Sequence, residues 1–460
     1  MIMLIQILVA IKIIHQLLYN LYLWQLKEYR KDRFTEHIKR TQHAIIRAYL
    51  HLSILAPFSL RKLPRPTIKV ILILFISIII NTLFIIRPDT ITLLIGLMVT
   101  PITIIIALGI IFPIEWSIRY LAYKLAQRKI KRLKAKGLTV IGITGSYGKT
   151  STKYFLTHTL SSRYKVHTTQ RSINTPLAVS LTILKALADE HAFFIVEMGA
   201  YRRGEILELC KIAQPDIGIV TGIGSQHLAL FGSQENIIKG KSELLRFLPS
   251  GALTLINKES THQPLIPKNK KLNVVYYSKK DLQDWLKTVR IPDFLKINIV
   301  PCLIIAERFN IPKKEILIVL NGLDEPEKTM KSSIGYKKAT IIDDSFTTNE
   351  NGFFEALKYL ENLDFKKRFI IMPCLIELGE RTQEVHIHIG KELRKSNVST
   401  IVTTRDYFDS IKEGSNDSQN IHLITKPESI IKMLKQNLDK NTIVLIEGKV
   451  NQQIIDFLKK

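Results

Sequence analysis

The sequence holds few cysteines, glycines and prolines, and these shortages already exclude several classes of protein. Its three cysteines, Cys210, Cys302 and Cys374, lie far apart and form no CxxC pair. A disulfide scaffold is therefore excluded, a cysteine-rich zinc site is disfavoured, and the usage suits a reducing compartment. The 21 glycines and 17 prolines among 460 residues are too few for a collagen-like or low-complexity chain. A hydrophobic content of 46% excludes wholesale disorder.

Acidic residues are scarce relative to basic ones, and the imbalance is uneven along the chain. The sequence holds 66 Lys and Arg against 40 Asp and Glu, a formal net charge of +26. Residues 1–140 hold 21 basic and five acidic residues, a net charge of +16. The length is enough for about three domains of ordinary size. We therefore expect the strongly basic first third to differ in character from the rest.

Two long apolar runs without a charge lie in this first third, at residues 70–86 and 91–114. A helix needs about 20 apolar residues to cross the hydrocarbon core of a bilayer. The second run is long enough, and the first becomes so when it starts near residue 67 and Lys69 snorkels. We therefore predict a transmembrane hairpin with spans near 67–86 and 91–114. A pair of buried helices in a soluble core is disfavoured, because such helices are rarely this long without a polar face.

Residues 1–24 are also apolar, but they include Lys12, His15 and Asn20. This pattern fits a third span whose polar face meets the hairpin, and it also fits an amphipathic helix in the plane of the membrane. We favour the span. The segment does not read as a cleaved signal peptide, because it has no basic start and no small-residue cleavage site.

Basic segments flank the apolar runs. Residues 25–66 hold ten basic and three acidic residues, and residues 119–136 hold eight basic residues and no acidic one. The positive-inside rule places both segments on the cytoplasmic face. We therefore predict a membrane-anchoring region over residues 1–136 of a multi-pass cell-membrane protein, with membrane lipids as partners and cytoplasmic catalytic domains. Nucleic-acid binding is disfavoured, because no aromatic-interleaved or groove-reading motif accompanies the basic runs.

From Leu138 onward, short β-branched runs alternate with helical stretches, a pattern typical of parallel sheets covered on both faces. The predicted strands are Leu138–Thr144, Phe193–Met198, Asp216–Thr221, Leu253–Asn257, Asn273–Tyr277, Ala339–Asp343, Phe369–Met372, Thr400–Thr403, Ile421–Ile424 and Ile443–Ile446. Ten strands predict two sheets and not one. A polar stretch with Gly and Pro at Asn321–Lys331 marks the break, which gives domains over residues 137–326 and 327–460.

The strongest local motif is VIGITGSYGKTSTKYF at residues 140–155, where a β-run enters a Gly-rich turn and a helix opens at Lys149. This arrangement aims backbone N–H groups and the positive end of a helix at phosphate. Lys149 would reach the β- and γ-phosphates, and Thr150 or Ser151 would face Mg²⁺. The predicted ATP-binding residues here are Thr144, Gly145, Ser146, Gly148, Lys149, Thr150 and Ser151. The strict pattern GxxxxGK[ST] is not met, because Ile143 stands at its first Gly.

The expected fold class is therefore α/β. A P-loop, parallel-sheet ATPase domain would be followed by a C-terminal Rossmann-like α/β domain, with transmembrane helices before both.

Further motifs follow the Gly-rich loop in a fixed order. TGSYGKTST at 144–152 is followed by EMGA at 197–200, GSQH at 224–227 and Gly240-Lys241. Together they resemble the Mur ligase superfamily, whose members join a carboxylate and an amine at the expense of ATP. Residues 138–460 resemble above all the branch that adds D-Ala-D-Ala to a muramyl peptide. Its pattern is matched by His227-Leu228, Phe231-Gly232-Ser233, Glu235, Ile237, Lys241, Glu243, Asp343-Asp344-Ser345, Asn349, Glu377-Leu378-Gly379, His386 and Gly390.

The resemblance assigns a magnesium site and two catalytic side chains besides Lys149. Glu197 ends a hydrophobic strand, where α/β ligand crevices open, and its hard oxygen suits Mg²⁺ together with Thr150. The resemblance implies that His227 is a second Mg²⁺ contact, although a lone histidine is more often a loop residue. It implies that Lys241 is carbamylated and helps to hold this site, although an exposed lysine is the ordinary reading. Carbamylation needs an amine that its surroundings deprotonate.

The resemblance also implies contacts to nucleotide and substrate. Asn174 would face substrate or phosphate, with an ordinary turn before Pro176 as the alternative. Asn257 would meet adenine, with strand-end capping as the alternative. Asp344 would contact the nucleotide as the C-terminal domain closes, and Asn349 would contact the substrate. Glu377 is interpreted as a positioning residue.

Several positions depart from the branch's pattern. A membrane segment stands where the soluble UDP-sugar-binding domain is expected, and the stretch between residues 257 and 298 is short for the central domain. The nucleotide-contacting Arg is replaced at Lys328-Thr329, with Lys328 or Lys331 as substitutes. Tyr-Asn-Ala-Asn-Pro reads as residues 346–350, ending in Asn349-Glu350, and Lys-Gly-Ser reads Glu447-Gly448-Lys449.

Three hypotheses about function follow. The first is a membrane-anchored ligase that uses ATP and Mg²⁺ and forms an acyl phosphate. It would add an amino acid or a dipeptide such as D-Ala-D-Ala to a small-molecule or lipid-linked muramyl peptide. The second keeps this chemistry but changes the substrate to a polyglutamate or cyanophycin type. The third is a catalytically degenerate, membrane-bound nucleotide-binding scaffold.

Overall fold

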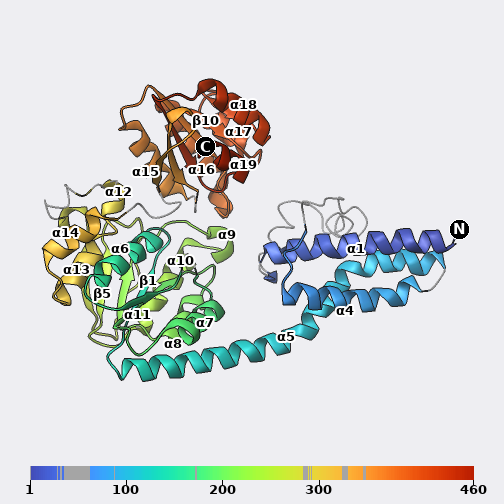
Figure 1. The fold of residues 1–460 in the computed structure, drawn as a ribbon, viewed down its shortest axis with the longest axis horizontal. Coiled ribbons are helices and arrows are strands. Elements are labelled where there is room, and N and C mark those ends of the chain that lie inside the picture. The colour runs from blue at the N-terminus through green and yellow to red at the C-terminus, as the bar shows by residue number, and fades with distance from the viewer. Residues whose placement is uncertain are drawn as a thin grey trace. The chain divides into compact units, whose positions relative to one another are not determined.

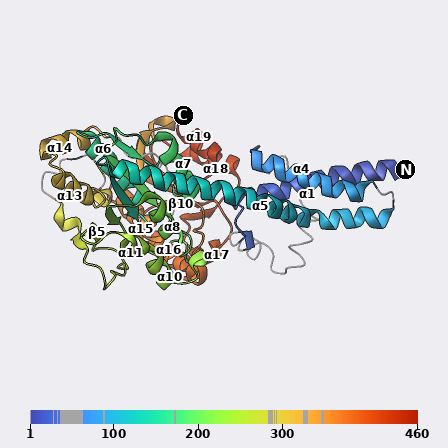
Figure 2. The same ribbon diagram turned by 90° about the horizontal axis from the view of Figure 1, so that it is seen from below.

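The computed structural model describes residues 2–27, 29–31, 34–35, 63–86, 89–170, 173–282, 289, 291, 293–323, 330–345 and 349–460. Two compact units make up the chain, residues 1–121 and residues 122–460. Figures 1 and 2 show the elements of each unit from two sides. Most of the predicted basic segment 25–66, as well as Lys328-Thr329 and residues 346–348, lies outside the described residues.

The first unit contains long apolar helices. Helix α1 (Ile2–Leu26) and helix α4 (Ile68–Ile85) belong to it, as does the first part of helix α5 (Thr90–Lys134). All three are long and apolar enough to cross a membrane. Their outer surfaces carry large apolar side chains, with Ile68 exposed by 80% and Ile91 by 72%. The apolar runs of the sequence thus form uninterrupted helices with apolar outer faces.

Polar side chains lie inside this helical unit instead of on its surface. The amide of Asn81 donates to the carbonyl of Ser77 over 2.7 Å and to the hydroxyl of Thr103 over 3.0 Å. Asn20 of α1 is also buried and donates to the carbonyl of Gln16 over 2.8 Å. Helix α1 therefore directs a polar face inward, as the sequence predicts for residues 1–24.

The second unit begins with a parallel sheet of six strands in the order β2-β3-β1-β4-β5-β6. The strands are β1 (Thr139–Thr144), β2 (Val166–Thr168), β3 (Phe193–Met198), β4 (Ile217–Val220), β5 (Leu253–Asn257) and β6 (Asn273–Tyr277). Strands β1, β3 and β4 lie in the middle and are almost entirely buried, because helices cover both faces.

The two helical layers follow from alternation along the strands. Ile141 and Ile143 of β1 pack into one cluster and Val140 into another. The first cluster is covered by α6 (Lys149–Ser161), α13 (Val300–Arg308) and α14 (Lys313–Asn321). The second is covered by the end of α5 and by α7 (Pro176–Ala186), α8 (Glu205–Ala213), α10 (Gln234–Lys241) and α11 (Glu243–Phe247) (Figure 1). Shorter helices are α9 (Leu228–Phe231) and α12 (Asp293–Lys296).

The last turns of α5 belong to this sheet domain. Ile130 is fully buried beneath the sheet. Lys134 forms an ion pair of 2.6 Å with Asp216, and Lys129 donates to the carbonyl of Leu184 over 2.9 Å. Part of the basic segment 119–136 thus binds the protein itself, which the charge pattern alone did not indicate.

The second sheet has the order β11-β10-β9-β12-β8-β7. Its strands are β7 (Lys331–Ile334), β8 (Thr340–Asp344), β9 (Lys367–Met372), β10 (Ser399–Val402), β11 (Ile421–Leu423) and β12 (Thr442–Glu447), and only the β7–β8 pairing is antiparallel. Helices α15 (Glu350–Glu361), α16 (Thr382–Lys395) and α17 (Phe408–Gly414) cover one face, and α18 (Pro427–Asn437) and α19 (Gln452–Leu458) cover the other.

The α/β fold class and the two sheets predicted from the sequence are confirmed, and all ten predicted strands are present within one or two residues. The described residues contain two further strands, β2 and β7. Both are sheet edges, where the alternation of buried and exposed residues is weak. Strand β2 has three residues, and β7 reads Lys-Ser-Ser-Ile.

Candidate active site

The Gly-rich loop lies between the end of β1 and the start of α6. Gly145 and Gly148 have positive φ angles of 150° and 81°. A Cβ atom at Gly145 would lie 2.1 Å from Oγ1 of Thr221, and one at Gly148 would lie 2.5 Å from Oδ1 of Asn298. Glycine is therefore required at both positions. A 13-residue helix starts here, as a phosphate cradle needs, and the N–H groups of Ser146 and Tyr147 donate to the carbonyl of Gly222.

We expect Gly145→Ala to destabilise the protein by about 1–3 kcal/mol through overpacking and to weaken ATP binding further by displacing the loop. Gly251→Ala is the matched control, since Gly251 also has a positive φ angle, of 79°, but its Cβ would meet nothing within 4 Å. Thermal unfolding with and without ATP measures both effects. Equal losses of ATP-dependent stabilisation in the two variants would contradict the close approach seen at the loop.

Lys149 folds back over the loop that precedes it. Its Nζ donates to the carbonyl of Gly145 over 2.7 Å and to that of Ser146 over 3.2 Å. Burial lowers the pKa of Lys149, and the neighbouring Lys153 lowers it further, whereas Glu197 raises it. The cationic end of Lys149 thus lies directly at the cradle, as the motif predicts.

Glu197 lies at the end of β3 with only 2% of its surface exposed. The hydroxyl of Thr150 donates to its Oε2 over 3.1 Å, and Nζ of Lys153 pairs with the same oxygen at 3.0 Å. Thr144 is bonded to the same strand, donating to the carbonyl of Met198 over 2.9 Å. Ser151 is buried one position further along α6.

The structure thus brings together Thr150 and Glu197, two of the predicted Mg²⁺ ligands. Both offer hard oxygen atoms, which suit Mg²⁺. Among the described residues no three His, Cys, Asp or Glu side chains gather into a metal site. The third predicted ligand, His227, is hydrogen-bonded to Glu377 instead.

His227 has a left-handed backbone, with φ of 64°, and its Nδ1 is hydrogen-bonded to Oε2 of Glu377. Glu377 is also left-handed, with φ of 66°, and its carbonyl accepts from the N–H of Ala229 over 3.1 Å. The ring of Tyr201 packs edge-on against the imidazole, with the two ring centres 4.5 Å apart. Burial lowers the pKa of His227, Glu377 raises it, and Lys241 and Lys149 lower it. Glu377 thus positions His227 in this structure.

Lys241 ends α10 with 2% of its surface exposed. Burial lowers its pKa to about 7, aided by the charge of Lys149 and opposed by Glu205, Glu243 and Glu197. Its ammonium forms no hydrogen bond or ion pair with any described residue, and it lies 5.7 Å from the centre of the Phe231 ring. The surface-lysine reading is therefore wrong, and the side chain meets the condition for carbamylation that the sequence could not show.

Two of the remaining predicted residues, Asn174 and Asn257, precede the C-terminal part of the chain. Asn174 lies against the EMGA motif, since a Cβ at Gly199 would be 2.3 Å from its Nδ2. Asn257 ends β5, and its side-chain oxygen accepts from the N–H of Glu259 over 2.9 Å. This is the strand-end capping that was the alternative to adenine contact.

In the C-terminal part, Asn349 caps α15 by accepting from the N–H of Gly352 over 3.0 Å. Asp344 ends β8 beside Glu447. Burial raises the pKa of Asp344 to about 7, and Asp343 adds to the rise. The carboxyl of Asp343 itself pairs with Lys459 at 2.5 Å.

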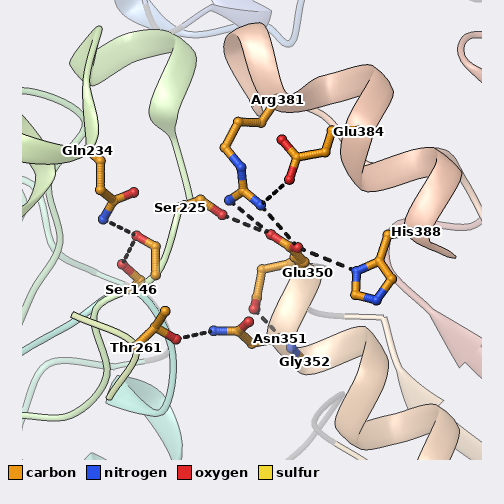
Figure 3. A network of polar contacts seen from close by, with 12 residues as sticks. Ser146, Ser225, Gln234, Thr261, Glu350, Asn351, Gly352, Arg381, Glu384 and His388 are labelled. Carbon is orange, nitrogen blue, oxygen red and sulfur yellow. Dashed lines mark hydrogen bonds and ion pairs between the residues drawn. The ribbon is translucent and has the colours of Figure 1, made fainter. Parts of the chain in front are cut away.

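A pocket lies beside the cradle, and polar residues that sequence reasoning missed lie at it. It is lined by Ser146, Tyr147, Gly224, Ser225, Gln226, Asn349, Glu350, Asn351, Leu375, Ile376 and Leu378. Figure 3 shows Glu350 within this lining, joined to Ser225 and to Arg381. Lys153 was also missed, although it follows Thr150 by three residues and so faces the same side of α6.

The whole arrangement is that of a nucleotide-dependent ligase, and comparison with known proteins agrees. The chain matches the Mur ligase middle domain over residues 143–300 and the Mur ligase, glutamate ligase domain over residues 330–450. The chain therefore belongs to the Mur ligase family of ATP-dependent ligases.

Two relatives of this chain share one enzyme name. The UDP-N-acetylmuramoyl-tripeptide–D-alanyl-D-alanine ligase of Bacillus subtilis is 24% identical over 350 residues, 71% of this chain and 76% of the relative. The enzyme of that name from Buchnera aphidicola is 29% identical over 364 residues, 72% of this chain and 78% of the relative.

Solved structures have the same fold. The MurF ligase of Thermotoga maritima in complex with ADP has a TM-score of 0.63 and 25% identity, covering 74% of this chain and 83% of that chain. MurF of Acinetobacter baumannii has a TM-score of 0.64 and 20% identity, covering 74% of this chain and 80% of that chain.

Proposed function

We propose that the protein is a membrane-anchored ligase that adds D-alanyl-D-alanine, or a similar amino acid or dipeptide, to a muramyl-peptide precursor of the cell wall. The observation that carries the proposal is the contact of Thr150 and Lys153 with Glu197 beside the glycine cradle. The names of the relatives supply the substrates. The proposed domains are residues 1–136 for the anchor, 137–326 for ATP binding and 327–460 for the C-terminal domain.

In this proposal the cradle from Thr144 to Ser151 binds the phosphates of ATP, and Lys149 offsets the charge on the γ-phosphoryl group. Mg²⁺, when bound by Thr150 and Glu197, neutralises phosphate charge. His227, held by Glu377, is the proposed second contact to Mg²⁺. The carbamate on Lys241 adds negative charge to the magnesium site. Asp344 contacts the nucleotide, as does Asn257 through the amide nitrogen that strand-end capping leaves available. Asn174 contacts the substrate, as does Asn349 from the start of α15.

The chemistry needs no nucleophilic side chain. An oxygen of the substrate carboxylate attacks the γ-phosphorus, ADP leaves, and an acyl phosphate forms. The neutral amine then attacks the acyl carbon, loses a proton, and expels inorganic phosphate as the amide forms. Water would hydrolyse the acyl phosphate, so the pocket beside the cradle must exclude it during this step.

Phosphate release by the purified full chain in detergent tests the proposal. With ATP, Mg²⁺, a muramyl tripeptide and D-alanyl-D-alanine, we expect release only when acceptor and amine are both present. UDP-linked and lipid-linked tripeptides are compared, because an anchored enzyme can meet either. An amine panel with glutamate and aspartate-arginine peptides separates this function from other ligations. Binding of ATP without amine-dependent turnover on any acceptor would refute it.

The anchor makes a separate prediction about topology. We expect the hairpin of α4 and α5 to cross the membrane, which places Asp89 and Lys124 on opposite sides. Single substitutions Asp89→Cys and Lys124→Cys introduce thiols at exposed positions, whereas the native cysteines are buried. In inside-out vesicles an impermeant maleimide should label Lys124→Cys alone, and in spheroplasts Asp89→Cys alone. Labelling of both from one side would contradict the hairpin.

A further inference from the structure

Glu350 lines the pocket beside the phosphate cradle and forms an ion pair with Arg381, which lies behind it and outside the lining. Nη2 of Arg381 donates to Oε1 of Glu350 over 3.4 Å, and its Nη1 lies 3.3 Å from Oε2 as an ion pair. Arg381 also pairs with Glu384 at 3.3 Å, and Nδ1 of His388 lies 4.0 Å from Oε1 of Glu350. The hydroxyl of Ser225 donates to the same carboxylate over 3.3 Å, and Figure 3 shows these groups converging. The side chain of Glu350 is 14% exposed and that of Arg381 is 38% exposed, so both charges remain accessible.

Glu350 shares a pocket with the loop of the phosphate cradle. The pocket wall on one side is the loop residue Ser146, and on the other it is the start of α15 with Glu350. In the proposed reaction the amine would approach the cradle through this pocket. Opposite charges are thus presented side by side next to the position of the electrophile.

Helix stability accounts for one member of the pair but not for the other. Glu350 is the first residue of α15, where a negative charge is favourable. Arg381 directly precedes the 14-residue helix α16, where a positive charge is unfavourable, and it makes no side-chain cap. The position of Glu350 also departs from the pattern that the sequence otherwise resembles, since Pro is expected there. Arg381 has a local partner in Glu384, three residues further on, but neither the helix nor the family pattern explains its contact with Glu350.

We propose that Glu350 and Arg381 form the subsite for a zwitterionic amine substrate, with Glu350 binding its ammonium group and Arg381 binding its carboxylate. This inference rests on the proposed function and names the part of the site that selects the amine. Without substrate the two side chains pair with each other, with Glu384 as a second partner of Arg381 and His388 as a second partner of Glu350. With substrate each exchanges its partner for a group of the same charge, and an arginine fork binds a carboxylate in two-pronged fashion.

Binding and steady-state kinetics of the full chain test this subsite, with D-alanyl-D-alanine as the probe. We expect Arg381→Gln and Glu350→Gln to weaken its binding by about 10- to 100-fold, as for a lost charged hydrogen bond. The loss should appear in the KM for the amine and not in the KM for ATP. Wild type should bind the C-terminal amide of the dipeptide equally weakly, and Arg381→Gln should no longer distinguish dipeptide from amide.

Matched controls lie on the same helices. Arg394→Gln on α16 and Glu361→Gln on α15 change exposed charges at the far ends of those helices. The double variant Glu350→Arg with Arg381→Glu separates a substrate subsite from a structural latch. It rebuilds the ion pair with reversed charges, so a latch would regain function, whereas a subsite would still reject the dipeptide. Recovery in the double variant, or unchanged binding in both single variants, would overturn the inference.

Failure of the subsite and failure of the proposed function give different results. Hydroxylamine captures acyl phosphate as a hydroxamate without needing the amine subsite. If the wild type forms hydroxamate from acceptor and ATP, but neither single substitution changes the KM for the amine, the subsite is wrong and the ligase chemistry stands. If no hydroxamate forms while the zwitterion binds through Arg381, the subsite stands and the proposed reaction is wrong.

Discussion

Lys149→Met is expected to reduce ATP-dependent amide formation by about 1,000-fold, the largest effect of any single substitution in the protein. Nζ of Lys149 lies 2.7 Å from the carbonyl of Gly145, at the cradle. The thioether of methionine retains the length of the side chain but removes the charge that offsets the transferring phosphoryl group. Rates of phosphate release at saturating ATP measure the loss.

Lys165→Met is the matched control for this substitution. Lys165 lies in the same domain, but it is a surface residue whose side chain is 61% exposed and pairs with Glu190. We expect its rate to equal that of wild type, with unfolding midpoints compared for both variants. A Lys149→Met enzyme that retains more than about a tenth of the wild-type rate would show that the lysine does not stabilise the transition state.

Lys241→Ala is expected to reduce activity by about 100-fold, with partial recovery when a small carboxylate such as acetate is added. Carbon dioxide adds to a neutral amine to give a carbamate and a proton. Because burial lowers the pKa of Lys241 to about 7, this side chain is neutral in roughly half of the molecules at pH 7. Acetate can occupy the space left by the truncated lysine and supply the missing negative charge.

The same pKa gives the direction of a pH effect. Reactivation of the wild type after removal of CO₂ should be faster at pH 8 than at pH 6 when the concentration of dissolved CO₂ is held equal, since the neutral amine is the reactive form. In CO₂-free buffer the unfolded chain holds more protons than the folded one between pH 7 and 10. Stability relative to Lys241→Met should therefore rise over that interval. Lys239→Ala on the same helix, where Lys239 pairs with Glu235 at 2.5 Å, should show neither effect.

The sequence predicted the fold well because its strands are strongly apolar and central. Strand β3 is buried at every position, and no helical pattern competes with it. The edge strand β7, which reads Lys-Ser-Ser-Ile, has no such apolar run and escaped prediction, whereas the more apolar edge strands β6 and β11 did not. The extent of α5 was underestimated for a related reason. Its apolar run ends near residue 114, but the helix continues to Lys134 because Ala126, Ile130 and Leu133 pack beneath the sheet.

The site was predictable where the motif itself fixes the geometry. A strand, a glycine turn and a helix place Lys149 and Thr150 by local rules, and Glu197 at the end of the adjacent strand follows from the parallel sheet. The burial of Lys241 was not predictable, because it depends on how α10 packs against other elements. Glu350 and Arg381 are 31 positions apart, and Ser225 precedes Glu350 by 125. No local spacing rule connects residues at such separations.

Transfer of oxygen from the substrate carboxylate to phosphate tests the central claim most directly. The full chain is supplied with ATP, Mg²⁺, D-alanyl-D-alanine and a muramyl tripeptide in which both oxygens of the terminal carboxylate are ¹⁸O, and the released phosphate is examined by mass spectrometry. An acyl phosphate requires that one oxygen of each phosphate come from the carboxylate, so we predict one ¹⁸O per phosphate. Phosphate that is free of ¹⁸O while the amide forms would contradict the account.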